Sequence, residues 1–526
     1  MNRIIYINLS EKKVEIKDHQ INSLDDCGRA LALSILKKNV PPRAEYLDAE
    51  NAIVLTPGLL SGTHAPSSGR FTVAAKRSQG GLRSVNLAGP FANRLASLGI
   101  SALVIRGESK DGTPLAVSID ENGASIEPAP DLKHAAVSQT ISSMRRKCGE
   151  EAAVVGIGPA GEHVMPLGAV FSTYPKGIPE YYCVRGGMGD VFGIKGLKAI
   201  AVASKQEFAN ELADKESFSQ KVKEITTLIR NHPICGKALP SYGSITLMKM
   251  LKEGASFEEP VAKIETVAAK SETSVNEAQQ KHINRACTLN CPIGCLNRHE
   301  TTGSTPFNSP FDSEAFAASK KFFGIEDQAF VIDLNKRCFE IGLDSIEFLS
   351  SCAIILKIEG ESDKKAGLTR LLDELESATP LGRIIGSTSR GIHSLYAEYR
   401  DTQKLVTQAA TSEHAKFSIS MPNRVKGAES LSDLEYLYSY ILASQNIGLC
   451  LFTTFAILDS PDGLEKLAEM VSAKTGAPMD PLSIIQSGHR SLQREREYEL
   501  ESMKAGMLDN IPEFVKVLYR YFGREK

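Results

Sequence analysis

Apolar and polar residues alternate along positions 3–8 and again along 13–17, and a polar segment at 10–13 separates the two runs. In a strand, successive side chains point to opposite faces, so this period of two predicts a β-hairpin. A pattern with helical period follows at 24–38.

Short apolar runs bounded by glycine or proline predict buried strands at 52–58 and 102–107. Arg70 stands directly after Gly69 and directly before another apolar run. We therefore interpret residues 1–204 as a β-rich domain with many glycine turns.

Two glycine-rich segments each allow two interpretations. Residues 156–161 spell G-x-G-x-x-G after an apolar run, as in a dinucleotide fingerprint. Pro159 and Pro166 exclude the long helix that this fingerprint requires, so we expect a tight turn between strands. In the second segment, Arg185 and its following glycines either contact a phosphate-bearing ligand or form a compact turn before a strand.

After residue 204 the apolar spacing changes to about 3.6 residues, which predicts helices. Asp327 is expected to cap one of them, and Asp344 either caps the next or contacts a ligand. Residues 254–286 are polar and are interpreted as a connection, and the charged run at 490–501 as a solvated helix face. Helices are expected at 213–231, 245–253, 326–342, 345–357, 364–376 and 434–445.

Composition excludes several classes of protein. The chain has 526 residues, so several domains are expected, and its 61 basic and 63 acidic residues give no electrostatic basis for binding nucleic acid. No apolar run approaches the length of a membrane span, and the first residues do not form a signal peptide. The ten cysteines show no disulfide framework, so we expect a reducing, cytoplasmic location.

Three of these cysteines, Cys287, Cys291 and Cys295, fall within nine residues. Pro292 and Gly294 make the segment a loop, and thiolates suit zinc, copper(I) or an iron–sulfur cluster. The alternative without a metal is a loop with three unrelated buried thiols. A zinc site could be completed by His299. A cubane cluster needs a fourth thiolate from a distant part of the chain. We take Cys450, which follows Gly448, as that ligand of one [4Fe–4S] cluster.

With these residues identified, most of the chain resembles the aldehyde:ferredoxin oxidoreductase family of tungsten enzymes. The motifs follow the family's order along the chain. They are the N-terminal hairpin, 56–58, 68–76, Asn86 with Gly89, 156–162, 185–189 through 198–202, the cysteine loop, 342–344, 425–427 and 448–450.

The resemblance implies an α+β protein with a β-rich base domain at 1–204 and two mainly helical domains at 205–405 and 406–526. It implies a tungsten or molybdenum pterin (molybdopterin-type) cofactor on the base and a [4Fe–4S] cluster beside it. The implied reaction oxidises an aldehyde and passes electrons to ferredoxin or another electron-transfer protein. A small-molecule substrate and a homodimer are expected, without nucleic acid or membrane as partners.

Residue by residue, Arg70 resembles the arginine between cluster and pterin. The other pterin contacts implied by the resemblance are Asn86, Ala88, Arg185, Gly186, Gly187, Leu343, Asp344 and Lys426. Glu314 resembles a glutamate near the metal, and Glu314 and Arg424 occupy the positions assigned to catalysis. Phosphates and a pterin favour arginine, lysine and exposed backbone N–H groups.

Several positions depart from the family. Both gaps between the loop cysteines are three residues, where the family has two and then three. Phe339 and Gln445 replace acidic residues, and Arg424 replaces a histidine. If that histidine transfers a proton, Arg424 cannot do the same, because a guanidinium does not deprotonate in a protein. The segment 426–450 and the C-terminal substrate loop are shortened. The departures favour one alternative, a non-catalytic relative serving as an electron-relay or cofactor-binding subunit. A zinc-stabilised protein without a redox role is a separate, third possibility.

Overall fold

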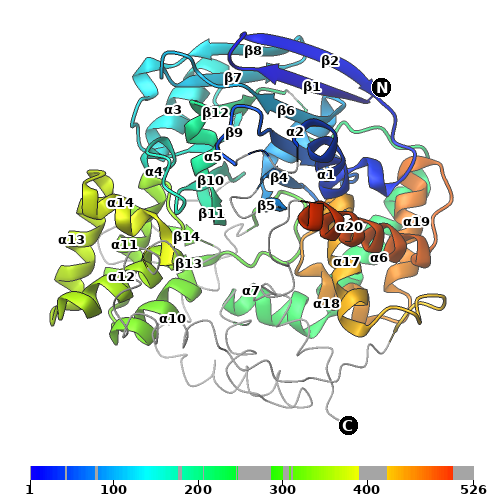
Figure 1. The fold of residues 1–526 in the computed structure, drawn as a ribbon. Coiled ribbons are helices and arrows are strands. Elements are labelled where there is room, and N and C mark those ends of the chain that lie inside the picture. The colour runs from blue at the N-terminus through cyan, green and yellow to red at the C-terminus, as the bar shows by residue number, and fades with distance from the viewer. Residues whose placement is uncertain are drawn as a thin grey trace.

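In the computed structural model, roughly the first two hundred residues form two six-stranded sheets (Figure 1). The first sheet has the order β2-β1-β6-β3-β4-β5 and the second the order β11-β10-β9-β12-β7-β8. Only β1–β6 and β7–β12 pair in parallel. The structure describes residues 2–41, 44, 46–76, 81–175, 180–204, 206–243, 246, 286–299, 307–309, 312–389, 392 and 423–501.

The strand bounds confirm the predicted hairpin and the predicted buried strands. Asn8 pairs with Lys13 where the hairpin closes. The strands are β1 Asn2–Asn8, β2 Lys13–His19, β3 Ile53–Pro57, β4 Arg70–Lys76, β5 Leu82–Ala88, β6 Ile100–Arg106, β7 Leu115–Asp120, β8 Gly123–Pro128, β9 Ala153–Ile157, β10 Ala169–Thr173, β11 Tyr181–Met188 and β12 Leu197–Val202.

The two sheets share one hydrophobic core. Phe71 and Leu103 of the first sheet belong to the same buried cluster as Val155 and Ile200 of the second. Helix α2 (Pro90–Ser97) contributes Phe91 to this cluster. The opposite face of the first sheet is covered by α1 (Gly28–Asn39), which follows the short helix η1 (Leu24–Asp26). Helix α3 (Val137–Cys148) contacts β9 and β12 of the second sheet.

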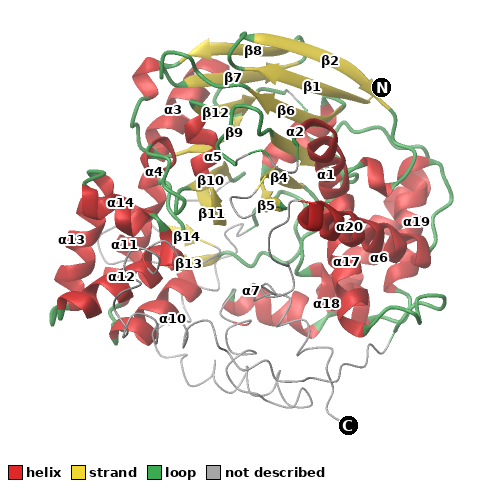
Figure 2. Cartoon of the chain, in the orientation of Figure 1, coloured by secondary structure: helices red, strands yellow, loops and turns green. Residues whose placement is uncertain are grey.

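Two helical groups lie below the sheets in this view, one at the left and one at the right (Figures 1 and 2). The first group is α10 Asp312–Phe323, α11 Gln328–Ile341, α12 Ser345–Glu359, α13 Lys364–Glu376 and α14 Pro380–Gly386. The second is α6 Lys215–Asn231, the π-helical turn η3 Pro233–Ala238, α7 Leu239–Tyr242, α17 Asp433–Ile447, α18 Thr453–Asp459, α19 Gly463–Thr475 and α20 Pro481–Glu501. The predicted α+β class, with a β-rich part before a mainly helical part, is confirmed.

The helices predicted from the apolar period are confirmed wherever the structure describes them. Asp327 caps α11, because its Oδ1 accepts a hydrogen bond from the Phe330 amide at 3.2 Å. The helix expected at 245–253 and nearly all of the connection at 254–286 lie outside the described residues. The boundaries at 204 and 405 stay predictions. Side-chain packing places α6, from the segment 205–405, in one cluster with α17, α18 and α19.

The G-x-G-x-x-G segment is a short connection between strands, as expected. β9 and β10 are antiparallel neighbours. The connection between them contains one short helix, α4 (Pro159–Glu162). A dinucleotide fingerprint would require a parallel strand after a long helix. Gly158 instead allows close packing, since a Cβ there would lie 2.4 Å from the Ile341 carbonyl oxygen. The glycine thus joins the second sheet to the end of α11.

Lys195 is a buried lysine that is held by backbone carbonyls. Its Nζ lies 3.2 Å from the Ala49 oxygen, 3.4 Å from the Gly107 oxygen and 3.5 Å from the Asp48 oxygen. Burial lowers the pKa of Lys195 from 10.5 to about 8, although Glu108 opposes the shift. The folded protein therefore holds this proton less tightly than the unfolded chain does.

The stability contribution of Lys195 is expected to rise with pH between about 8 and 10.5 and to be lost as pH falls through 8. Over that window the slope is at most about 1.4 kcal/mol per pH unit. Thermal unfolding of wild type and Lys195→Met at pH 7.5 and 9.5 tests this. The wild type should gain melting temperature relative to the variant at the higher pH, and a pH-independent difference would contradict the expectation.

Within the described segments, no helix is both long and apolar enough to cross a bilayer.

Candidate functional site

Arg70, Asn86 and Ala88 lie on one face of the first sheet. The register pairs Arg70 with Ala88 and Thr72 with Asn86, and Thr72 also pairs with Thr56. Directly paired residues of adjacent strands present their side chains on the same face. The structure therefore brings together three residues that the sequence predicted as pterin contacts.

The cross-strand row Thr56–Thr72–Asn86 on this face holds buried polar atoms without a protein partner. Among the described residues, Thr56 Oγ1, Thr72 Oγ1 and Asn86 Nδ2 are buried and form no hydrogen bond. Buried polar groups are usually satisfied by protein, water or ligand. Three such atoms in one cross-strand row fit a bound polar molecule or ordered water over this face.

Arg70 connects the sheet to the predicted cluster ligands. Its Nη2 donates a hydrogen bond to Cys450 Sγ at 3.3 Å. Burial disfavours the Arg70 cation, but the charges of Cys450 and Cys287 outweigh burial, so the pKa of Arg70 is raised. A permanent cation at this position can stabilise thiolate ligands.

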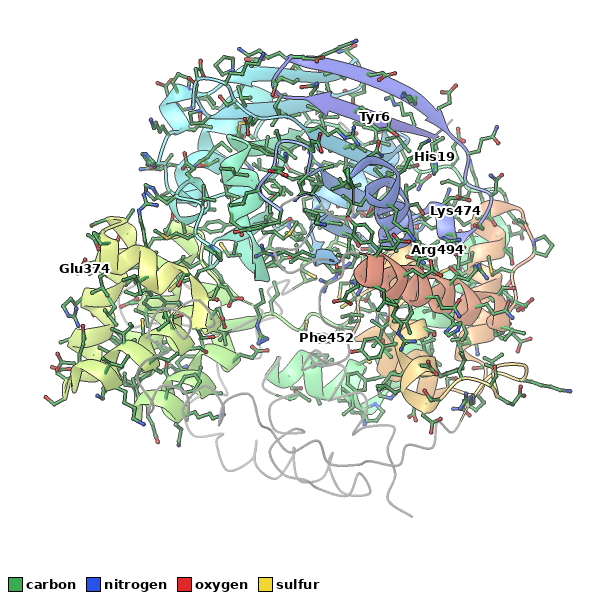
Figure 3. The ribbon with its side chains drawn as sticks, viewed as in Figure 1. Tyr6, His19, Glu374, Phe452, Lys474 and Arg494 are labelled. Carbon is green, nitrogen blue, oxygen red and sulfur yellow. The ribbon has the colours of Figure 1, made fainter. Side chains whose placement is uncertain are left out.

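Cys450 is placed by a segment that pairs with the end of β3 and the loop before β4. The amides of Leu59 and Leu60 donate to the carbonyls of Asn446 and Ile447, at 3.0 and 2.8 Å. Gly448 has φ +92°, and a Cβ on Gly58 would lie 2.1 Å from the Gly448 Cα. Only a pair of glycines allows this backbone approach. Figure 3 shows Phe452, two residues beyond Cys450, near the middle of the view.

The cysteine loop docks on residues 63–70. Asn290 Nδ2 donates to Ser68 Oγ at 2.9 Å and to the Thr63 and Ala65 carbonyls. Ser67 contacts both cysteine segments, since its Oγ lies 3.5 Å from Cys291 Sγ and its carbonyl accepts from the Cys450 amide at 2.9 Å. The connection between β3 and β4 therefore contacts both segments that carry the predicted ligands.

The four thiols lie close enough to perturb one another. Burial raises the pKa of Cys287 to about 12, and Arg70 opposes that shift. Burial also raises the pKa of Cys295, and Cys450, Cys287 and Cys291 raise it further. In the described part of the chain, no three His, Cys, Asp or Glu side chains form a group that could hold a single metal ion.

A polynuclear cluster and a mononuclear zinc site make different demands on these thiols. Each thiolate of a cubane binds a different iron, so the sulfur atoms lie further apart than the ligands of one ion. The zinc alternative depends on His299, whose side chain lies outside the described part of the structure. The assignment of the four cysteines to a [4Fe–4S] cluster stays a prediction.

A second group of predicted residues meets where the second sheet joins α12. Asp344 caps α12, because its Oδ1 accepts from the amides of Ile346 and Glu347 at 3.1 and 3.2 Å. Its Oδ2 accepts from the Gly186 amide at 3.1 Å. Leu343 is fully buried and forms a β-bridge with Gly168. The capping role considered for Asp344 is confirmed, and the carboxylate also fixes residues 185–187, an irregular part of β11.

Sequence reasoning missed Arg83, the arginine that supports the irregular part of β11 at 185–187. Arg83 forms an ion pair with the buried Asp190, and its Nη1 lies 3.0 Å from each carboxylate oxygen. It also donates to the Gly186 carbonyl at 3.3 Å. Burial raises the pKa of Asp190 and Arg83 opposes the shift. No motif marks this pair, because its residues are more than one hundred positions apart.

The remaining predicted residues are dispersed. Lys426 is exposed, Glu314 is half-buried on α10, and Arg185 is half-buried. Arg424 forms an ion pair with Asp433 at 2.9 Å and donates to the Ala428 and Leu431 carbonyls. Among the contacts the structure describes, none joins Lys426 or Arg424 to Arg70, so their assigned roles stay predictions.

The two positions where the family has acids have clear structural roles here. Phe339 is 1% exposed in the core shared by the two sheets. Gln445 Oε1 accepts from Arg29 at 3.1 Å, and Arg29 forms a bidentate pair with the fully buried Glu495 at 2.6 and 2.7 Å. Neither side chain carries a carboxylate that could accept a hydrogen bond from a pterin.

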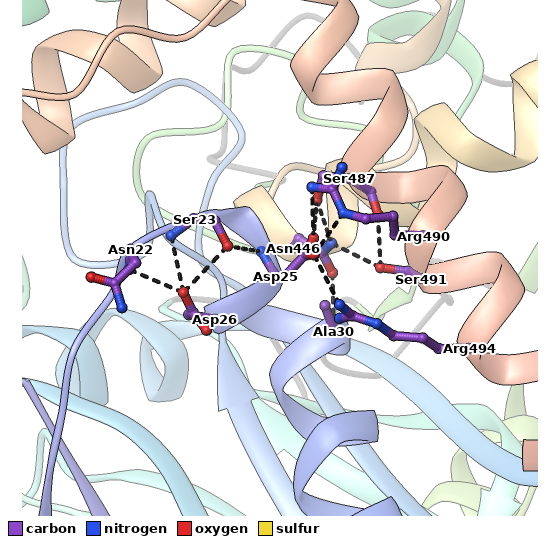
Figure 4. Close-up of polar contacts among 10 residues, drawn as sticks. All are labelled: Asn22, Ser23, Asp25, Asp26, Ala30, Asn446, Ser487, Arg490, Ser491 and Arg494. Carbon is purple, nitrogen blue, oxygen red and sulfur yellow. Dashed lines mark hydrogen bonds and ion pairs between the residues drawn. The ribbon is translucent and has the colours of Figure 1, made fainter.

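Asn446, beside Gln445, joins α1 to α20 (Figure 4). Its Oδ1 accepts from the Ala30 amide at 2.9 Å, and its Nδ2 donates to Ser487 and Ser491 at 3.4 and 3.3 Å. Asp25 accepts from Ser487 at 2.9 Å and pairs with two arginines of α20, Arg490 and Arg494. This network fixes the turn that carries Cys450.

An open pocket of about 600 Å³ lies elsewhere, between α6, η3 and α18. His232 borders it, but both ring nitrogens are engaged. Nδ1 accepts from the Ile234 amide at 3.2 Å, and Nε2 lies 3.4 Å from Asp459 Oδ2. None of the predicted site residues lines this pocket.

Comparisons with known proteins match both the β-rich and the helical part of the chain. The family model for the N-terminal domain of aldehyde ferredoxin oxidoreductase matches residues 4–204, and the model for its domains 2 and 3 matches residues 220–373. The tungsten-containing aldehyde ferredoxin oxidoreductases of Thermococcus kodakarensis and Pyrococcus furiosus are 31% and 32% identical over 388 and 366 residues. These alignments cover 72% and 68% of this chain but 61% and 58% of the relatives, so the chain matches less than two thirds of their length.

A similar solved structure is the active site complex BamBC of benzoyl coenzyme A reductase with 1,5-dienoyl-CoA. The TM-score is 0.73 at 17% identity, and the match covers 98% of this chain and 93% of that one. At this identity the likeness is one of fold.

Proposed function

Since the chain belongs to the aldehyde ferredoxin oxidoreductase family, we propose that it is an oxidoreductase with a pterin-bound tungsten or molybdenum and a [4Fe–4S] cluster. Its substrate is an aldehyde or a related small molecule. Oxidation of an aldehyde to an acid takes one oxygen from water and releases two protons and two electrons. The electrons leave through the cluster to ferredoxin or another electron-transfer protein.

The observation that carries this proposal is the position of Arg70. Its strand places it on the face that carries Asn86 and Ala88, while its guanidinium contacts Cys450. One cation thus touches a predicted cluster ligand and lies on the predicted pterin surface. The bound pterin metal supplies the two-electron redox chemistry, and the cluster supplies single-electron transfer.

The chain's own residues would hold both groups. Cys287, Cys291, Cys295 and Cys450 provide the soft anionic ligands that a cluster requires. The unsatisfied Asn86 amide provides a hydrogen-bond donor for a pterin, whereas the Gly186 amide is already bonded to Asp344. Both carboxylate oxygens of Asp344 accept hydrogen bonds from backbone amides, Oδ2 from Gly186 and Oδ1 from Ile346.

The second candidate function is a non-catalytic electron-relay or cofactor-binding subunit. Two observations favour it: Phe339 is a core residue, and the Arg424 guanidinium is held by Asp433 and by nearby carbonyls. A guanidinium held in this way stabilises a turn and moves no proton.

Elemental analysis of anaerobically purified protein separates the two functions. About four irons with roughly one tungsten or molybdenum per chain, and aldehyde-dependent reduction of ferredoxin, are expected for the enzyme. About four irons without a heavy metal would instead support the relay subunit. Zinc without iron would contradict both functions and support the zinc-stabilised alternative.

A further inference from the structure

Ser67 is the residue that touches both cysteine-bearing segments at once. Its amide donates to the Asn290 carbonyl at 3.1 Å, inside the cysteine loop. Its carbonyl accepts from the Cys450 amide at 2.9 Å. Its hydroxyl lies 3.5 Å from Cys291 Sγ, within hydrogen-bond distance for sulfur. Ser67 is 2% exposed, so water does not compete for these contacts.

The backbone of Ser67 is held in an unfavourable region. Its φ is +56°, in the left-handed region that non-glycine residues rarely adopt. The two backbone hydrogen bonds to Asn290 and Cys450 hold it there. Residues kept in such conformations by their surroundings cluster at functional positions, and this conformation directs the Ser67 hydroxyl to a predicted cluster ligand.

A hydroxyl donor changes the electrostatics of a cluster thiolate. A hydrogen bond partly neutralises the negative charge on sulfur. The reduced cluster carries one more negative charge than the oxidised one, so the bond stabilises the reduced form more. Hydrogen bonds to the sulfurs are among the factors that set the reduction potential of an iron–sulfur cluster.

We propose that Ser67 is a positioning residue that raises the reduction potential of the [4Fe–4S] cluster through its hydrogen bond to the Cys291 thiolate. This inference rests on the proposed function, because it requires the cluster. Arg70 and Ser67 then act on different ligands, the guanidinium on Cys450 and the hydroxyl on Cys291.

Two variants and one matched control test the inference. Ser67→Ala removes the hydroxyl but keeps a Cβ at positive φ, whereas Ser67→Gly removes the hydroxyl and relieves the backbone. Ser68→Ala is the control, since Ser68 is an adjacent, fully buried serine whose hydroxyl meets Ala65 and Asn290 rather than a thiol. Iron per chain and the midpoint potential, from a redox titration followed by electron paramagnetic resonance, are measured on the full anaerobic chain.

Both Ser67 variants are expected to keep the wild-type iron content and to shift the potential to more negative values, while Ser68→Ala keeps the wild-type potential. An unchanged potential in Ser67→Gly, or an equal shift in Ser68→Ala, would overturn this inference and leave the proposed function standing. Should Ser67→Ala fail to fold, Ser67→Gly alone decides. Absence of iron from the wild-type protein would overturn both.

Discussion

Cys450→Ala is expected to lose most of the protein's iron. The substitution removes one of four predicted thiolate ligands and leaves the half-buried Arg70 guanidinium without its sulfur acceptor. Loss of a residue that merely supports a metal ligand lowers affinity about 10–100-fold, so loss of a ligand should have at least that effect. Iron and acid-labile sulfide per chain, with the visible absorbance of the cluster, measure the result.

Cys148→Ala is the matched control for this experiment. Cys148 is a half-buried thiol on α3 that contacts Ser118 at 3.2 Å, and it lies outside the cysteine loop. We expect this variant to keep the iron content of the wild type. Equal iron in Cys450→Ala and wild type would contradict the assignment of Cys450 and leave the fourth ligand to be found elsewhere.

Glu495→Ala is expected to lower the free energy of unfolding of the α1–α17–α20 unit by about 3–5 kcal/mol. The side chain of Glu495 is fully buried and that of Arg29 is 17% exposed, so the substitution leaves a mostly buried guanidinium without a counter-ion. Gln445 cannot replace the lost charge. Thermal and denaturant unfolding should show a lower midpoint.

Glu497→Ala on the same helix provides the control. The Glu497 side chain is 62% exposed, and its pair with Lys37 spans 3.5 Å. Exposed pairs of this kind contribute about 0–1 kcal/mol, so little change is expected. If the two variants unfolded at the same midpoint, the Arg29–Glu495 pair would have no special role in stability.

Local patterns in the sequence were sufficient to predict several of the secondary-structure elements. The hairpin at 3–17 and the helix at 364–376 follow from periods of two and 3.6, which depend only on neighbouring residues. The capping role of Asp327 follows from its position directly before a helix. These features need no knowledge of distant contacts.

The supports of the candidate site could not be predicted in the same way. Ser67 meets Cys291 across 224 positions, and Arg29 meets Glu495 across 466. No local pattern distinguishes these side chains from ordinary surface or core residues. The cysteines stood out because thiols are rare and closely spaced here, and the pterin positions because a family resemblance pointed to them.

The contacts of Asn446 also set an order of events during synthesis. Chains fold as domains while they emerge from the ribosome, N-terminal parts first. The two sheets can form early, but the turn that carries Cys450 is held by Ser487 and Ser491 of α20, which are made later. We therefore expect that an inorganic centre enters the chain only after α20 has been made, and that ribosome-bound chains ending before α20 do not retain iron.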